Sequence, residues 1–183
     1  MVEEPFDLSR IGPPHWALDE LTDHIVDRHH RYVQGAIPAL RDALARAADR
    51  WGASHAPVLA VQAIFQELAD ELEPHMAKEE HLLFPAIRDL VQARRERRAV
   101  PPLAFATLLH PIRVMEGEHS RARTLLADLR RETQNYQPPA AADATGRETY
   151  RELAAFDADL ERHIHLEDDL LFPKALELER HVA

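Results

Sequence analysis

The same eleven-residue pattern occurs twice in this chain, as HMAKEEHLLFP at residues 75–85 and HIHLEDDLLFP at residues 163–173. Every matched position is offset by 88 residues, and a looser match pairs His30 with His119 at an offset of 89. A long internal repeat indicates two copies of one supersecondary unit. We therefore expect two helix hairpins, each with one His followed by one His-x-x-x-Glu motif.

Apolar residues recur at steps of three and four along four stretches, which is typical of helices that face a common core. Segments rich in Pro and Gly separate these stretches. The expected helices cover about residues 15–50, 56–97, 102–133 and 147–178. The predicted fold class is all-α, an up-down-up-down four-helix bundle built from two duplicated helix hairpins. A length of 183 residues suits a single domain over residues 1–183.

The composition excludes several classes of protein. A net charge of −10 disfavours a nucleic-acid partner, and the absence of Cys excludes thiolate metal sites, iron–sulfur ligation and disulfides. No apolar stretch approaches the roughly 20 residues of a membrane span, and the first ten residues do not resemble a signal peptide. We expect a cytoplasmic protein with no membrane partner. The unusual component is histidine, with 12 residues.

Four of the histidines lie on the apolar seams, at positions separated by 45, 44 and 44 residues. In an up-down bundle each gap comprises half of one helix, a loop and half of the next, so equal gaps place the four side chains at one height. A Glu four residues after the second and fourth His lies on the same helix face as that His. The candidate metal ligands are therefore His30, His75, Glu79, His119, His163 and Glu167.

Two buried carboxylates facing each other need compensation, because an unpaired buried charge costs several kcal/mol. A network of protonated His and ionised Glu is one solution, but six convergent and duplicated ligand types favour metal. Imidazole with carboxylate suits iron, manganese or zinc. A structural zinc site is closed by four ligands, so six predict two ions. With two imidazoles per ion and both Glu bridging, open positions remain for an oxo or hydroxo bridge and an exogenous molecule.

The paired segments resemble the hemerythrin-type (HHE) cation-binding domain over about residues 15–178. Within that superfamily, DHI at residues 23–25, HMAKEE at residues 75–80 and PIRVMEGEH at residues 111–119 are most similar to the bacterial repair-of-iron-centres proteins. The resemblance implies a non-haem di-iron centre, with two iron ions bridged by Glu79 and Glu167 and carried by the four histidines. Many repair-type proteins carry an additional small N-terminal domain with cysteines, whereas this chain has no Cys.

The resemblance also implies a role in nitrosative or oxidative stress, and three functions stay open at this point. The first is repair of damaged iron centres, with iron–sulfur proteins as partners. The second is reversible binding of O₂ or NO for storage or sensing. The third is an oxidoreductase acting on peroxide or NO. The fold alone does not choose among them.

Several other residues near the seams are expected to be structural, solvated or supporting residues rather than metal ligands. His29 is an alternative to His30, but lies roughly 100° away around the helix. His24 and His110 are expected to line an access path rather than to bind metal, and the role of His55 stays open. His81 and His165 are expected to be solvated or to support the ligands. The remaining candidates are Glu80 and Glu118 as hydrogen-bond partners of ligand histidines, and Phe84, Phe172, Pro85 and Pro173 as core and kink residues.

Overall fold

The computed structural model describes residues 16–182. This part of the chain contains four long helices joined by three connections. Helix one comprises α1 (Leu18–His24), the π-helical segment η2 (Ile25–His30) and α2 (Arg31–Trp51). Helix two comprises α3 (Pro57–Lys78), η3 (Glu79–Leu83) and α4 (Phe84–Glu96). Helix three is α5 (Leu109–Glu132), and helix four comprises α6 (Ala144–His165), η4 (Leu166–Leu171) and α7 (Phe172–Val182).

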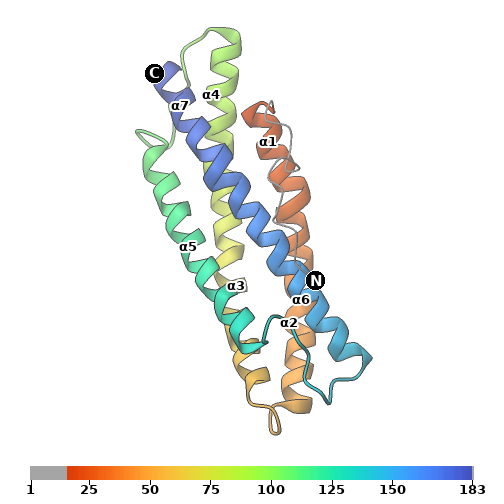
Figure 1. The fold of residues 1–183 in the computed structure, drawn as a ribbon. Helices are drawn as coiled ribbons and strands as arrows, with labels where there is room; N and C mark the ends of the chain where they lie inside the picture. Colours follow the sequence, from red (N-terminus) through yellow and green to blue (C-terminus); the bar gives the residue numbers. More distant parts are fainter. Residues whose placement is uncertain (1–15, 183) are drawn as a thin grey trace, which may run out of the picture.

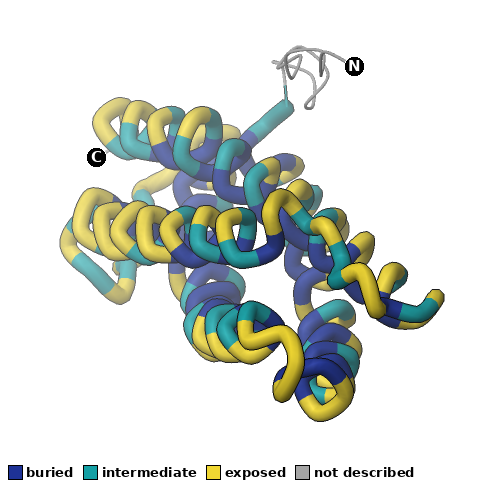
Figure 2. The backbone as a smooth tube through the Cα atoms, turned by 60° about the horizontal axis from the view of Figure 1, so that its bottom comes forward, coloured by how far each residue is buried: buried dark blue, intermediate teal, exposed yellow. Residues whose placement is uncertain are grey.

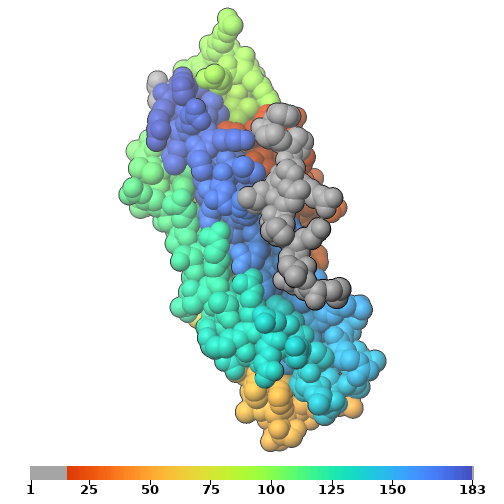
Figure 3. Space-filling view, in the orientation of Figure 1, coloured from red at the N-terminus to blue at the C-terminus, as the bar shows by residue number. Residues whose placement is uncertain are grey.

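Successive helices run in opposite directions, which confirms the predicted all-α bundle (Figure 1). In one half of the bundle, α3 packs against α2 and α5, and α2 also packs against α6. In the other half α4 packs against α1 and α7. The described part of the molecule is elongated, with the α2–α3 and α5–α6 connections at one end and the α4–α5 connection at the other (Figure 3). None of its helices is long and apolar enough to cross a membrane.

Helices two and four each widen into a π-helical turn just before a proline. The N–H of Phe84 donates to the carbonyl of Glu79, and the N–H of Phe172 donates to the carbonyl of Glu167. The next residues, Pro85 and Pro173, have no N–H, and a proline ring crowds the carbonyl four residues before it. The α-helical ladder is therefore interrupted at the same point of both repeats. The two wide turns carry Glu79 and Glu167.

Two helix starts differ from the prediction. Helix three begins at Leu109 rather than near residue 102, because its first turn is satisfied by a distant side chain: Glu179 on α7 accepts hydrogen bonds from the backbone N–H of Leu108 and the hydroxyl of Thr107, both at 2.8 Å. Helix four begins at Ala144 rather than near residue 147, because Asp143 caps it by accepting from the N–H of Gly146 at 2.9 Å. The predicted start of helix one at residue 15 lies outside the described residues.

The apolar core is divided into two large clusters. One cluster is formed by α2, α3, α5 and α6, and includes Phe65 and Phe156. The other is formed by α1, α4, α7 and the start of α5, and includes Phe84 and Phe172. Figure 2 shows buried positions following the inner sides of the helices. A small third cluster around Trp51 closes one end of the bundle.

Candidate metal centre

The structure brings all six candidate ligands together between the two large apolar clusters. They come from all four helices, and each is at most 2% exposed. The equal sequence gaps therefore correspond to one level of the bundle. The side chains at this level are His30, His75, Glu79, His119, His163 and Glu167.

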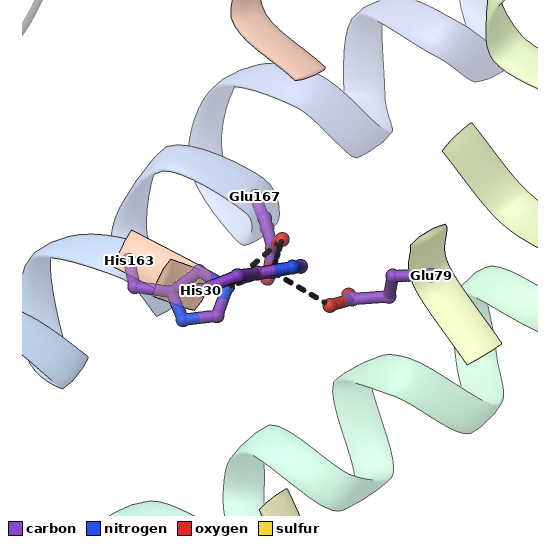
Figure 4. Close-up of side chains that lie close together, drawn as sticks. All are labelled: His30, Glu79, His163 and Glu167. Atoms are coloured by element: carbon purple, nitrogen blue, oxygen red, sulfur yellow. Dashed lines mark hydrogen bonds and ion pairs between the residues drawn. The ribbon is translucent and has the colours of Figure 1, made fainter. Parts of the chain in front are cut away.

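The six side chains form two donor sets that share both carboxylates. The 30/163 position consists of His30 and His163 with Glu79 and Glu167, which point toward one another in Figure 4. The 75/119 position consists of His75 and His119 with the same two glutamates. The Nε2 atoms are 3.2 Å apart in the first pair and 3.1 Å apart in the second. Each position thus takes one His from each hairpin, a pairing that the sequence did not settle.

The two carboxylates are buried without a hydrogen bond. Oε2 of Glu79 lies 3.3 Å from Nε2 of His30 and 3.4 Å from Nε2 of His75. The oxygens of Glu167 lie 3.0 Å from Nε2 of His163 and 3.1 Å from Nε2 of His119. None of these four oxygens has a hydrogen-bond partner among the described residues.

That arrangement fits cations better than a hydrogen-bonded network. A network of protonated His and ionised Glu would satisfy the carboxylate oxygens, because buried polar groups are normally hydrogen-bonded. Metal–ligand distances near 2.1 Å put neighbouring ligand atoms about 3 Å apart, in line with the separations found here. The donor set is nitrogen and carboxylate oxygen, which hard and borderline metal ions accept.

Three of the four histidines are oriented by a carboxylate behind them. Nδ1 of His30 lies 2.8 Å from Oε1 of Glu80, and Nδ1 of His75 lies 2.8 Å from Oε2 of Glu118. Nδ1 of His119 lies 2.7 Å from Oδ1 of Asp168. An ionised carboxylate only accepts, so each imidazole donates from Nδ1 and directs Nε2 inward.

The predicted roles of Glu80 and Glu118 as hydrogen-bond partners are thereby confirmed. Asp168 was missed, although the repeat could have found it. It follows Glu167 as Glu80 follows Glu79.

Two aromatic rings brace the same level. Phe84 stacks on His30 with ring centroids 5.7 Å apart, and Phe172 stacks on His119 at 5.9 Å. Both phenylalanines are fully buried in the core. The Phe-Pro pairs of the repeat therefore place an apolar ring against the lone His of the same hairpin, in addition to the wide turn.

Burial and charge act in opposite directions on these groups. Burial lowers the pKa of His119, but the hydrogen bond with Asp168 and the carboxylate of Glu167 outweigh it and raise the pKa to about 10. The pKa of His30 is also raised, because Glu79, Glu167 and Glu80 outweigh its burial. Burial lowers the pKa of His163 despite the carboxylate of Glu167. The two buried carboxylates thus favour positive charge at the level of the six side chains.

The other histidines lie outside both donor sets. Nδ1 of His29 lies 3.1 Å from Oδ2 of Asp159, so His30 and not His29 faces the centre. The ring of His24 packs against Trp16 at 4.6 Å, and its predicted place on an access path stays a hypothesis, as does that of His110. His165 pairs with Asp169 at 2.5 Å. The exposed histidines include His55, His81 and His110.

Comparison with known proteins agrees with this geometry. The profile of the hemerythrin HHE cation-binding domain matches residues 21–175. The chain belongs to this family. Among its relatives is the iron-sulfur cluster repair protein YtfE of Enterobacter sp. (strain 638), 35% identical over 161 residues, which are 87% of this chain and 67% of the relative.

Two further relatives carry similar names. YtfE of Musicola paradisiaca is 36% identical over 163 residues, covering 87% of this chain and 66% of the relative. A probable iron-sulfur cluster repair protein of Haemophilus influenzae is 32% identical over 157 residues, covering 86% and 65%. The chain thus spans about two thirds of the length of these relatives. It is an HHE cation-binding domain related to iron–sulfur cluster repair proteins, with two buried His/Glu clusters consistent with a binuclear metal site.

Proposed function

We propose that this protein holds two iron ions between Glu79 and Glu167 and serves in the repair of iron–sulfur centres under nitrosative or oxidative stress. The observation that carries the proposal is the set of four buried carboxylate oxygens without a hydrogen bond, flanked by two imidazole pairs. A cation at each position would neutralise these oxygens. Iron–sulfur proteins are the partners in this proposal.

Each glutamate belongs to both donor sets and is therefore positioned to bridge two ions. His30 and His163 would hold one ion, and His75 and His119 the other. Iron held there would supply one-electron chemistry and could bind a small molecule such as O₂, NO or peroxide. The protein's own contribution is to orient the imidazoles through Glu80, Glu118 and Asp168 and to cover the centre with apolar rings.

The choice of iron rests on two independent considerations. The donors are imidazole and carboxylate with no thiolate, which suits iron, manganese or zinc. The relatives at 32–36% identity are named for iron–sulfur cluster repair. Manganese and zinc are therefore the alternatives that a metal analysis must exclude.

Metal content tests the centre directly. Protein loaded anaerobically with Fe²⁺ and freed of excess metal should retain two ions per chain, one for each donor set. Glu79→Gln and Glu167→Gln should each lose most of both ions, because each glutamate serves both positions. Glu116→Gln, at an exposed site on the same helix as His119, is the matched control. Fewer than two ions per native chain, or unchanged content in both glutamate variants, would contradict the two-iron centre.

Recovery of a damaged cluster tests the function. A [4Fe–4S] protein that peroxide has converted to its [3Fe–4S] form, with loss of one iron, should regain its visible spectrum when mixed anaerobically with the Fe²⁺-loaded chain and a chemical reductant that supplies the one electron needed. The Glu79→Gln variant, treated identically, should restore little. If the reduced protein instead forms a stable, reversible adduct with O₂ and restores no cluster, the chain is a binding module and the repair proposal fails.

A further inference from the structure

One ligand histidine lacks the support that the other three have. Nδ1 of His163 is buried and has no hydrogen-bond partner among residues 16–182. A ligand imidazole that donates its far N–H to a carboxylate is more basic and better oriented, and loss of such a partner typically weakens metal binding by 10–100-fold. The unsupported histidine belongs to the 30/163 position.

The repeat shows where the missing carboxylate should be. His75 and His163 are equivalent, and the partner of His75 is Glu118, the residue before His119. His30 is the equivalent of His119, and the residue before His30 is His29. His29 stacks on His163, with ring centroids 5.8 Å apart and an interplanar angle of 12°. An imidazole therefore occupies the place at which the other hairpin supplies a carboxylate.

His29 makes its hydrogen bond with a carboxylate and not with His163. Its Nδ1 lies 3.1 Å from Oδ2 of Asp159. No hydrogen bond joins it to His163 in the described part of the chain. The surroundings also differ, because Lys78 pairs with Glu118 whereas Leu166 stands at the equivalent point of the second repeat.

The carboxylates behind the 75/119 position are themselves fixed by cations. Glu118 pairs with Lys78, and Asp168 accepts from Nη1 of Arg123 at 2.8 Å. Behind the 30/163 position the only outer carboxylate on a ligand is Glu80, which accepts from the neutral amide of Gln34 at 3.3 Å, within residues 16–182. The imidazoles of His75 and His119 are thus held in their orientation more firmly than those of His30 and His163.

We propose that the two metal positions are unequal, that the 30/163 position releases its ion first, and that His29 sets this difference. The inference rests on the proposed two-iron function and deepens it, since the 30/163 position then supplies the iron given up in repair. His29 is a positioning residue that acts through His163. The 75/119 position retains its ion and keeps the two hairpins joined.

Release of Fe²⁺ to an excess of a chelator that colours on binding it measures the difference. The native protein, loaded anaerobically with two ions, should release them in two phases of equal amplitude, with rates that differ about 10–100-fold. His29→Glu should slow the fast phase toward the slow one. His29→Gln supplies a neutral acceptor and avoids repulsion from Asp159, so it should slow the fast phase less.

Two variants assign the phases to positions. His29→Leu removes the imidazole without adding an acceptor, so it should keep the fast phase. Glu118→Gln removes the charge behind His75, so it should accelerate the slow phase only. Acceleration of the fast phase by Glu118→Gln, or slowing by His29→Leu equal to that by His29→Glu, would overturn the assignment to His29.

Failure of the inference is separable from failure of the proposed function. Two bound ions that leave the native protein in a single phase would overturn the inequality and leave the two-iron centre intact. Binding of fewer than two ions would instead overturn the centre itself. The phases also report on positions directly, so a variant that merely destabilises the fold would accelerate both and would not reproduce the selective pattern.

Discussion

The two hairpins of this bundle carry the same inner side chains but support them differently. In hairpin one, formed by helices one and two, His30 is backed by Glu80 and stacked on Phe84. In hairpin two, formed by helices three and four, the equivalents are His119 with its partners Asp168 and Phe172. Duplication has thus preserved the contacts made within a hairpin. The differences concern side chains that reach across to the other hairpin or lie farther from the centre.

A second pair of equivalents, Arg41 and Arg130, shows a further difference between the hairpins. Arg41 lies 3.5 Å from Glu73, and its counterpart Arg130 lies 2.7 Å from Glu161. Nε of Arg130 also donates to buried Asp157 at 2.7 Å, whereas Nε of Arg41 is buried without a partner among the described residues. Ala69 stands where hairpin two has Asp157. Hairpin one therefore lacks two carboxylates that hairpin two has, because Ala69 stands in place of buried Asp157 and His29 stands in place of Glu118.

The largest effect should come from the buried phenylalanine that each hairpin places against its ligand histidine. Phe84→Ala and Phe172→Ala each empty a fully buried site, so each should lower the free energy of unfolding by about 3–5 kcal/mol. Urea denaturation of both variants and the native protein measures this. The comparison predicts similar losses. A loss below about 1 kcal/mol in either variant would show that the core relaxes there and would break the equivalence.

A smaller and unequal effect is expected at the arginine pairs. Asp157→Ala leaves Arg130 and Tyr136 without their buried acceptor, so it should cost about 2–3 kcal/mol of unfolding free energy. Asp70→Ala removes an exposed partner of Arg41 and should cost at most about 1 kcal/mol. The same denaturation experiment compares them. Equal losses would mean that burial of Asp157 contributes nothing.

The smallest effect concerns the outer carboxylates. Glu80→Gln and Asp168→Asn keep an acceptor oxygen but remove its charge, so each should weaken one metal position about tenfold, or about 1.4 kcal/mol. Competition with a chelator measures the two affinities. Glu80→Gln should act on the weaker position and Asp168→Asn on the tighter one. A uniform change at both positions in either variant would show that the outer carboxylates act through the fold as a whole.

The repeat and the spacing of four histidines were enough to predict the bundle and the level at which six side chains meet. They did not reveal which histidines share a position, because that depends on how the hairpins cross. The start of helix three was misjudged, since the acceptor for Leu108 comes from Glu179 at the far end of the chain. The repeat could have identified Asp168, because Asp168 follows Glu167 as Glu80 follows Glu79. The lack of support at His163 needed the structure, because it follows from where His29 packs.

The polar layer between the two apolar clusters has a consequence for folding. Proteins can open in contiguous cooperative units of different stability rather than all at once. Here the clusters around Phe65 and Phe84 meet across a band of imidazoles and carboxylates. We therefore expect the two halves of the bundle to open as separate units more readily when no ion is bound. On the proposed function, the binding free energy of the ions would add to the folding free energy, so metal content would decide whether this chain behaves as one folding unit or two.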